Sequence, residues 1–201
     1  MPSPHARLDP TLHRMDYGRA LKGELLMQEK PQGWVPYAQP LLDAVALFEE
    51  LGIGYALIGG IAAMYYGRSR FTEDVDFVAV TGHMDTLASH PAEMEKYHFD
   101  PSCTCKLYHA SGVHVDLRKD QHADRIVANS HPVELAGRSI RMIDLLDLVS
   151  MKLRAHRLKD DYDISQILLS NPVEEDKLRA AVTAEEFAWF LDIKKRSSKE
   201  S

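Results

Sequence analysis

The sequence predicts an α/β (α+β) fold, with a small mixed β-sheet, flanking helices and a helical C-terminal third. Up to about residue 143, short apolar segments alternate with segments of helical spacing, which is typical of a sheet covered by helices. From Asp144 onward the spacing is helical only. The length of 201 residues suits one compact domain, or one domain with a small helical appendage.

We divide the chain into four regions. Residues 1–40 are rich in proline and are expected to form an N-terminal arm, partly irregular, with one short helix near Tyr17–Gln28. Residues 41–143 form the core and residues 144–193 a C-terminal helical region. Residues 194–201, KKRSSKES, are expected to be a mobile basic tail.

The first half of the core alternates helices and strands, separated by glycines. Apolar residues at helical spacing predict the first helix, which Gly52 ends, and short apolar runs predict the strands. The expected elements are a helix over Leu41–Leu51, a strand over Tyr55–Ile58, a helix from Gly59 to about Gly67, a strand over Val75–Val80 and a helix over Leu87–Tyr97.

Two hairpins are expected in the second half of the core. Ser111-Gly112 is a turn sequence between strands over Cys105–Ala110 and Val113–Arg118. A weaker signal, Ala136-Gly137-Arg138, separates strands over His131–Leu135 and Ser139–Met142.

The C-terminal region begins with Asp144, a residue type that caps helix N-termini. An inward apolar stripe follows it, with Ile143, Leu146, Val149 and Leu153 at helical spacing. Three further helical segments are expected, over Tyr162–Leu169, Glu174–Val182 and Glu185–Ile193. The segment Tyr162–Leu169 either continues the helix that Asp144 begins or starts a second one.

Asp74-Val75-Asp76 is the first candidate for chemistry. Side chains alternate along a strand, so both carboxylates face one way, and hard divalent cations favour such oxygen ligands. The pattern alone is weak, because a solvated strand edge gives the same pair. Gly59-Gly60 strengthens it, since glycines at a strand–helix junction let the backbone approach a phosphate closely.

A third carboxylate, Asp116, follows on the second strand of the first hairpin. If that strand neighbours Val75–Val80, Asp116 completes a triad with Asp74 and Asp76. Two carboxylates can hold one metal ion, and a third permits two ions and a general base for an attacking hydroxyl. A polar face on a half-exposed strand is the alternative explanation for Asp116.

These residues resemble the DNA-polymerase-beta-type nucleotidyltransferase superfamily. The block Arg70–Phe77 is similar to the Arg-x-Ser/Thr-x-Asp-hydrophobic-Asp block of the AbiEii-like (type IV toxin–antitoxin) nucleotidyltransferases and related uncharacterised bacterial proteins. Met151–Ile164 resembles the lysine- and aspartate-containing helical segment of that group. The resemblance covers about residues 40–170 and implies that the mixed sheet is a nucleotidyltransferase core.

The second block supplies candidate nucleotide contacts. We place Lys152, His156, Lys159 and Asp163 as one stripe on a single helix, where Lys152 would balance triphosphate charge with support from Arg157 or Lys159. The resemblance implies that Asp160 is a second essential residue. A solvated helix face carrying ion pairs is the alternative.

Arg70 and Thr72 are further nucleotide-binding candidates. The resemblance implies that Thr72 donates to a γ-phosphate, and Arg70 could fix a phosphate or the aspartate pair. Both residues could equally organise the turn into the strand.

Composition restricts the partners. The net charge of −6, with its acidic excess in residues 41–193, argues against a broad basic face, and no DNA-binding motif occurs. The N-terminus lacks the apolar segment of a signal peptide, and no apolar run could span a bilayer. Cys103 and Cys105 cannot form a disulfide framework, so we expect a cytoplasmic protein without a membrane partner.

The resemblance implies an enzyme that moves a nucleoside monophosphate from a nucleoside triphosphate to a hydroxyl and releases pyrophosphate. The expected cofactor is Mg²⁺ or Mn²⁺, held by Asp74, Asp76 and Asp116, with Gly59 and Gly60 shaping the phosphate turn. The acceptor is expected to be an RNA 3′ end or a protein, and the chain the toxin of a toxin–antitoxin pair with an antitoxin as partner. Two alternatives stay open: a non-enzymatic regulator that kept the fold, and a transferase acting on an antibiotic-type small molecule.

Overall fold

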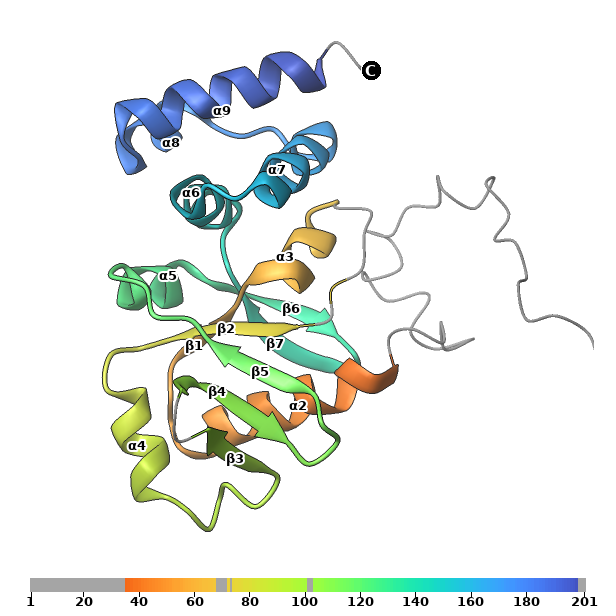
Figure 1. The fold of residues 1–201 in the computed structure, drawn as a ribbon, viewed down its shortest axis with the longest axis vertical. Coiled ribbons are helices and arrows are strands. Elements are labelled where there is room, and N and C mark those ends of the chain that lie inside the picture. The colour runs from red at the N-terminus through yellow and green to blue at the C-terminus, as the bar shows by residue number, and fades with distance from the viewer. Residues whose placement is uncertain (1–34, 68–71, 73, 101–102, 199–201) are drawn as a thin grey trace, which may run out of the picture.

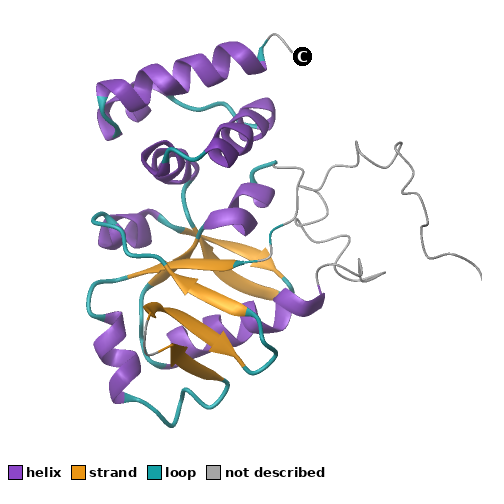
Figure 2. Ribbon diagram, in the orientation of Figure 1, coloured by secondary structure: helices purple, strands orange, loops and turns teal. Residues whose placement is uncertain are grey.

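A seven-stranded mixed sheet forms the centre of the computed structural model, which describes residues 35–67, 72, 74–100 and 103–198 (Figures 1 and 2). The strand order is β3-β4-β5-β2-β1-β7-β6. The strands are β1 (Tyr55–Leu57), β2 (Val75–Ala79), β3 (Tyr97–Asp100), β4 (Cys103–His109), β5 (His114–Leu117), β6 (His131–Leu135) and β7 (Arg138–Met142). The α/β class and the mixed sheet predicted from the sequence are confirmed.

The two parallel pairings lie at the centre of the sheet. β2 runs parallel to β5, and β1 runs parallel to β7, whereas the other neighbouring strands are antiparallel. Both predicted hairpins are present: Gly112 has a φ of 85° in the first, and Ala136 and Gly137 have φ of 54° and 75° in the second. The positive angles of Ala136 and Gly137 fit a primed turn. In the first hairpin Gly112 alone is left-handed and its N–H donates to the His109 carbonyl at 2.8 Å, which fits a three-residue loop that ends on a left-handed glycine.

Helix α2 (Val35–Glu50) covers one face of the sheet. Its Phe48 packs edge-on against Phe77 of β2, with ring centroids 5.2 Å apart, and Tyr55 of β1 completes the aromatic cluster. Helix α3 (Gly59–Tyr65) contacts β2 and also the C-terminal helices, and α5 (Ala123–Asn129) contacts β1 and β2 (Figure 1). The sheet core is therefore held from both sides.

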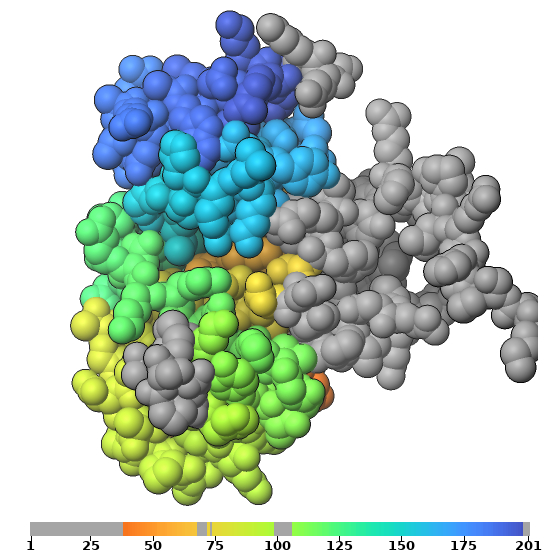
Figure 3. Space-filling view, viewed as in Figure 1, coloured from red at the N-terminus to blue at the C-terminus, as the bar shows by residue number. Residues whose placement is uncertain are grey.

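The C-terminal third consists of four helices packed on one another, as the sequence predicts. They are α6 (Leu145–Ala155), α7 (Leu158–Ser170), α8 (Glu175–Ala181) and α9 (Ala184–Ser197). The Asp144 carboxylate caps α6 by accepting from the Leu146 N–H at 2.8 Å, which confirms the predicted cap. Helix α6 contacts α3, and in the space-filling view the C-terminal helices lie against the end of the sheet core that carries α3 (Figure 3).

Several predicted bounds are wrong. The helix expected over Leu87–Tyr97 is instead α4 (His83–Ser89), followed by turns and then by β3, a strand the sequence did not predict. Pro91 lies just beyond the end of α4, and β3 forms because it pairs with β4. Helix α5 was also not predicted.

The ends of the chain differ from expectation in two places. Helix α2 begins at Val35, within the expected arm, and contains Pro40. Helix α9 continues to Ser197, so the start of the expected mobile tail is helical, and the Arg196 guanidinium donates to Asp161 at 3.0 Å. The rest of the arm, with the helix near Tyr17–Gln28, lies outside the described residues. None of the described helices is both long and apolar enough to span a membrane.

Candidate active site

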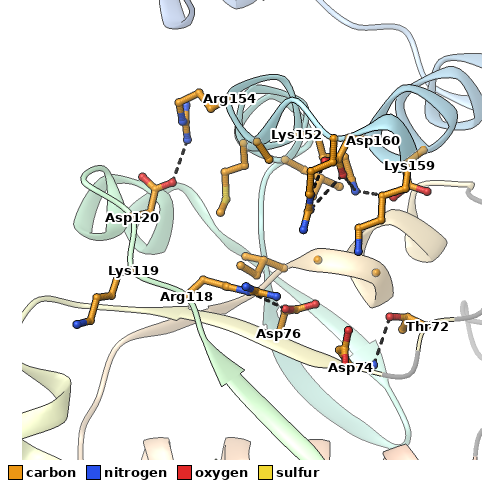
Figure 4. A pocket seen from close by; sticks show the side chains of 18 residues that line it. Thr72, Asp74, Asp76, Arg118, Lys119, Asp120, Lys152, Arg154, Lys159 and Asp160 are labelled. Atoms are coloured by element: carbon orange, nitrogen blue, oxygen red, sulfur yellow. Dashed lines mark hydrogen bonds and ion pairs between the residues drawn. The ribbon is translucent and has the colours of Figure 1, made fainter. Parts of the chain in front are cut away.

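The parallel pairing of β2 with β5 brings two aspartates side by side. Asp76 on β2 is the register partner of Asp116 on β5, and both carboxylates are largely buried. The condition placed on Asp116, that its strand neighbours β2, is therefore met. Asp74 lies just before β2 and is exposed. In Figure 4, Asp76 lies between Arg118 on one side and Asp74 with Thr72 on the other.

Arg118 bridges the two buried carboxylates. Its Nε donates to Asp76 Oδ1 at 3.0 Å, and its Nη2 forms an ion pair with Asp116 Oδ2 at 3.0 Å. We call these three residues the Arg118 cluster. Arg118 is not among the site residues predicted from the sequence. A signal was present, because a residue two positions after Asp116 continues the same face of an extended chain.

Charge in the Arg118 cluster is only partly balanced. Burial raises the pKa of the Asp116 carboxyl above its usual value, and the neighbouring Asp76 and Asp74 raise it further, against the lowering effect of Arg118 and Lys106. Partial burial would lower the pKa of Arg118, but Asp76 and Asp116 raise it, so the guanidinium stays charged. Asp116 Oδ1 is buried, and among the described residues it has no hydrogen-bond partner; Lys106 Nζ is 3.8 Å away.

Gly59 and Gly60 leave room for two of the candidate side chains. A Cβ on Gly59 would lie 2.1 Å from Asp76 Oδ2, and a Cβ on Gly60 would lie 2.3 Å from Thr72 Oγ1. Gly59 also has a φ of 66°, which disfavours any residue with a side chain. The glycines therefore allow the α3 backbone to approach Asp76 and Thr72 closely.

A cavity of about 590 Å³ lies between this end of the sheet and helices α6 and α7. Its volume is in the range of small-molecule sites. The two glycines and the Asp-x-Asp pair form its sheet side, and basic and acidic residues of α6 and α7 form the other (Figure 4). Of the predicted site residues, the cavity wall includes Gly59, Gly60, Thr72, Asp74, Asp76, Lys152, Arg157, Lys159 and Asp160.

The block Met151–Ile164 is not one helix, so the predicted single stripe is wrong. His156 has a φ of 49° and ends α6, and α7 begins at Leu158. The two helices fold against each other and bring Lys152 to Asp163 across the break. The bend was not predicted because no glycine or proline marks it in the sequence.

Lys152 lies in a buried ion-pair network. Its Nζ donates to Asp163 Oδ2 at 2.7 Å and to Asp160 Oδ1 at 3.3 Å. Arg157 Nε donates to Asp160 Oδ2 at 2.8 Å. We call these four residues the Lys152 cluster. They tie α6 to α7, and they leave the ammonium of Lys152 already paired with two carboxylates at the wall of the cavity.

The remaining candidates differ in what they contact. Lys159 extends from α7 toward the sheet side of the cavity and, among the described residues, makes no ion pair (Figure 4). Thr72 Oγ1 accepts a long hydrogen bond of 3.4 Å from the Asp74 N–H, which fits a role in the turn. Arg70 lies outside the described residues. Arg154 donates to Asp120 at 3.2 Å and so joins α6 to the segment after β5.

The donor set suits a hard divalent cation in its chemistry. Asp76 and Asp116 present carboxylate oxygens on adjacent strands, and the orphaned Oδ1 of Asp116 has a free lone pair. As the side chains stand, the described residues contain no group of three or more His, Cys, Asp or Glu close enough to hold an ion. The guanidinium of Arg118 fills the bridging position.

Comparison with known proteins identifies a matching protein family. The family described as "Nucleotidyltransferase of unknown function (DUF6036)" matches residues 46–199, and no curated protein matches the chain. An antigenic nucleotidyltransferase-like protein from Paracoccidioides brasiliensis has a similar structure, with 19% identity and a TM-score of 0.54 over 80% of this chain and 88% of that one. This likeness shows that the two proteins share a fold.

Two further solved structures resemble the chain more distantly. The lincomycin-bound lincosamide antibiotic adenylyltransferase LnuA has 15% identity and a TM-score of 0.44 over 66% of this chain and 97% of that one. The antibiotic-resistance factor ANT(2'')-Ia has 12% identity and a TM-score of 0.49 over 82% of this chain and 95% of that one.

Proposed function

The chain belongs to the family described as "Nucleotidyltransferase of unknown function (DUF6036)", and from this premise we propose that it transfers a nucleoside monophosphate from a nucleoside triphosphate to a hydroxyl acceptor. The observation that carries the proposal is the register of β2 and β5, which places Asp76 beside Asp116 next to a cavity of about 590 Å³. Asp74 lies at the wall of the same cavity.

The carboxylates are the proposed ligands of the metal. Asp74, Asp76 and Asp116 would hold Mg²⁺ or Mn²⁺, which when bound would neutralise charge on the triphosphate and on the attacking oxygen. Asp116 would take the proton of the acceptor hydroxyl through Oδ1, which no described donor occupies.

The cavity wall supplies the proposed nucleotide contacts. Gly59 and Gly60 would present backbone to the phosphates, since their missing side chains leave α3 close to Asp76. Lys159 is the best-placed cation on α7, because its ammonium is exposed and extends into the cavity. Lys152 and Arg157 would act from their ion pairs with Asp160 and add positive charge to the wall.

The proposed acceptor is a macromolecule. The two sequence blocks favour the AbiEii-like branch, in which the acceptor would be an RNA 3′ end or a protein and the chain the toxin partner of an antitoxin. The acidic excess of residues 41–193 limits the contact to a short end of RNA. Cytoplasmic localisation is part of the same proposal.

Label transfer tests the reaction. The full chain is incubated with Mg²⁺ and each α-labelled nucleoside triphosphate in turn, with RNA, protein or aminoglycoside and lincosamide antibiotics as acceptors. We expect label on one acceptor class, and a loss of at least about a hundredfold in Asp76→Asn, because a metal ligand is removed. Asp85→Asn on α4 is the matched control, since it makes the same change at an exposed site outside the cavity wall.

Each outcome decides between the alternatives. Label on an antibiotic would overturn the macromolecular acceptor and retain the transfer chemistry. Equal rates for Asp76→Asn and Asp85→Asn would overturn the site. No transfer from any of the four nucleotides, together with a stable complex with a protein partner, would favour the non-enzymatic regulator.

A further inference from the structure

Arg118 is the one described cation that contacts both Asp76 and Asp116. The segment that carries it is firmly placed, because the Arg118 N–H donates to the Phe77 carbonyl at 2.7 Å and extends the β2–β5 ladder by one step. Its side chain is 48% exposed, whereas the two carboxylates are only 10% and 9% exposed. A fixed backbone thus carries a side chain that solvent reaches.

The carboxylates that Arg118 contacts are the ones that would hold a metal ion. The guanidinium takes Asp76 Oδ1 and Asp116 Oδ2, one from each strand. A cation that bridges the strands would bind the same two carboxylates, and two positive charges cannot share them at close range without strong repulsion. Binding of the ion and binding of the guanidinium therefore compete.

A displaced guanidinium would remain beside the cavity. Arg118 forms part of the cavity wall, on the side of β5 that faces α6. Arginine is well suited to phosphate, because its planar fork binds two oxygens at once. A triphosphate in the cavity would offer such oxygens within reach of a side chain that no longer contacts Asp76.

We propose that Arg118 is a resident cation of the carboxylate pair, which a divalent ion displaces and which then binds the triphosphate. This inference rests on the proposed nucleotidyl transfer. It predicts two opposite effects of the Arg118 side chain on affinity. The side chain weakens binding of the divalent ion and strengthens binding of the nucleotide.

Mn²⁺ alone is the probe for the first step. Calorimetry without nucleotide is expected to show that Arg118→Gln binds Mn²⁺ about tenfold more tightly than the wild type, since the competing charge is gone. Lys119→Gln is the matched control, because Lys119 lies next along the chain and directs its ammonium away from the carboxylates (Figure 4). Removal of that charge is expected to change Mn²⁺ affinity by less than about twofold.

The second step uses a non-hydrolysable nucleoside triphosphate at saturating Mn²⁺. Arg118→Gln is expected to bind it about tenfold more weakly than the wild type, because the phosphate loses a charge-assisted contact. Mn²⁺ affinity that is unchanged or weaker in Arg118→Gln would overturn competition. Unchanged nucleotide affinity would overturn the phosphate contact.

Two further variants keep the test decisive. Arg118→Lys retains one charge but cannot span both carboxylates, so we expect it to bind Mn²⁺ about threefold more tightly than the wild type. This variant tests the proposal even if Arg118→Gln does not fold, and the absence of a gain in Mn²⁺ affinity would overturn the proposal. Asp76→Asn separates this inference from the function. If the wild type and Asp76→Asn bind Mn²⁺ and nucleotide equally poorly, the proposed function fails as well. If binding depends on Asp76 and Arg118→Gln shows no gain, only the role of Arg118 fails.

Discussion

The Arg118 cluster and the Lys152 cluster have the same chemistry in different surroundings. In each, one cation pairs with two aspartates. Arg118 bridges aspartates on two strands, Asp76 on β2 and Asp116 on β5, whereas Lys152 on α6 binds two aspartates that both lie on α7. Lys152 is 6% exposed and its carboxylate partners are at most 1% exposed, whereas Arg118 is 48% exposed. Arg118 can therefore exchange with ions from solvent, and Lys152 cannot do so without unfolding the α6–α7 junction.

Burial thus separates a structural ion pair from an exchangeable one. Breaking a buried pair leaves an uncompensated charge in a medium of low dielectric constant, which is strongly destabilising. Breaking a half-exposed pair costs less, because water and dissolved ions replace the lost partner. Both clusters lie at one cavity, so the fold places a fixed cation on the helical side and a movable one on the sheet side.

The largest expected effect comes from removal of the fixed cation. Lys152→Met leaves Asp160 and Asp163 buried without the ammonium between them, and we expect the free energy of unfolding to fall by about 3–5 kcal/mol. Urea denaturation measures it. Lys177→Met is the matched control, since the Lys177–Glu174 pair is exposed and its loss should cost less than about 1 kcal/mol. Equal losses in the two variants would contradict the structural role of the Lys152 cluster.

The next effect concerns the space that Gly59 leaves for the Arg118 cluster. Gly59→Ala adds a Cβ 2.1 Å from Asp76 Oδ2 at a φ of 66°. Gly52→Ala makes the same change at a φ of 64° with nothing within 4 Å, so it isolates the backbone strain. We expect Gly59→Ala to be less stable than Gly52→Ala by about 2 kcal/mol in thermal or urea denaturation, because the overlap must be relieved.

Mn²⁺ affinity is a second quantity that can be compared between the two glycine variants. Gly59→Ala is expected to weaken Mn²⁺ binding relative to Gly52→Ala, because Asp76 must move away from the new methyl group. Similar stability and similar Mn²⁺ affinity in the two variants would show that the close approach of α3 to Asp76 is not needed.

The smallest effect extends the comparison to a third ion-pair site, at Asp43, whose partner Lys96 is 59% exposed. Burial would raise the pKa of Asp43, but hydrogen bonds from Lys96, Gln39 and His109 outweigh it and hold the pKa below its usual value. Asp43 therefore stabilises the fold above about pH 4, and this contribution is lost as the pH falls through the lowered value.

Urea denaturation at pH 6 and at pH 3 tests this pH-dependent contribution of Asp43 to stability. The stability difference between wild type and Asp43→Asn should be larger at pH 6 than at pH 3, because the stabilisation by the carboxylate decreases as the pH falls below the unfolded-state pKa of about 4. Asp176→Asn, at an exposed position on α8, controls for loss of a surface carboxylate. A difference that grows toward pH 3 would give the opposite sign and reject the explanation.

Local sequence signals correctly predicted the turns and the helix cap, which are determined by a few neighbouring residues. The turn at Gly112, the turn at Ala136-Gly137 and the cap at Asp144 depend on backbone angles and hydrogen bonds within a few residues. The pairing of Asp76 with Asp116 was expected only on the condition that two strands are neighbours, which the observed register fulfils.

Long-range pairing overrode local signals elsewhere. β3 is a strand because Tyr97–Asp100 pairs with β4, although the sequence predicted a helix that ended at Tyr97 and no strand after it. The bend at His156 escaped prediction because a histidine at positive φ carries no turn signature, and packing of α6 against α7 stabilises it.

The sequence by itself determined the α/β class, the hairpins, the helical C-terminal third and the identity of the glycines and carboxylates at the candidate site. Only the tertiary structure decided which cation lies between which carboxylates. Asp76 and Arg118 are 42 positions apart, and Lys152 reaches Asp163 across a helix break. The physical reason is that a charge interacts through space and according to its burial, so its partner depends on the packing of strands and helices and not on spacing along the chain.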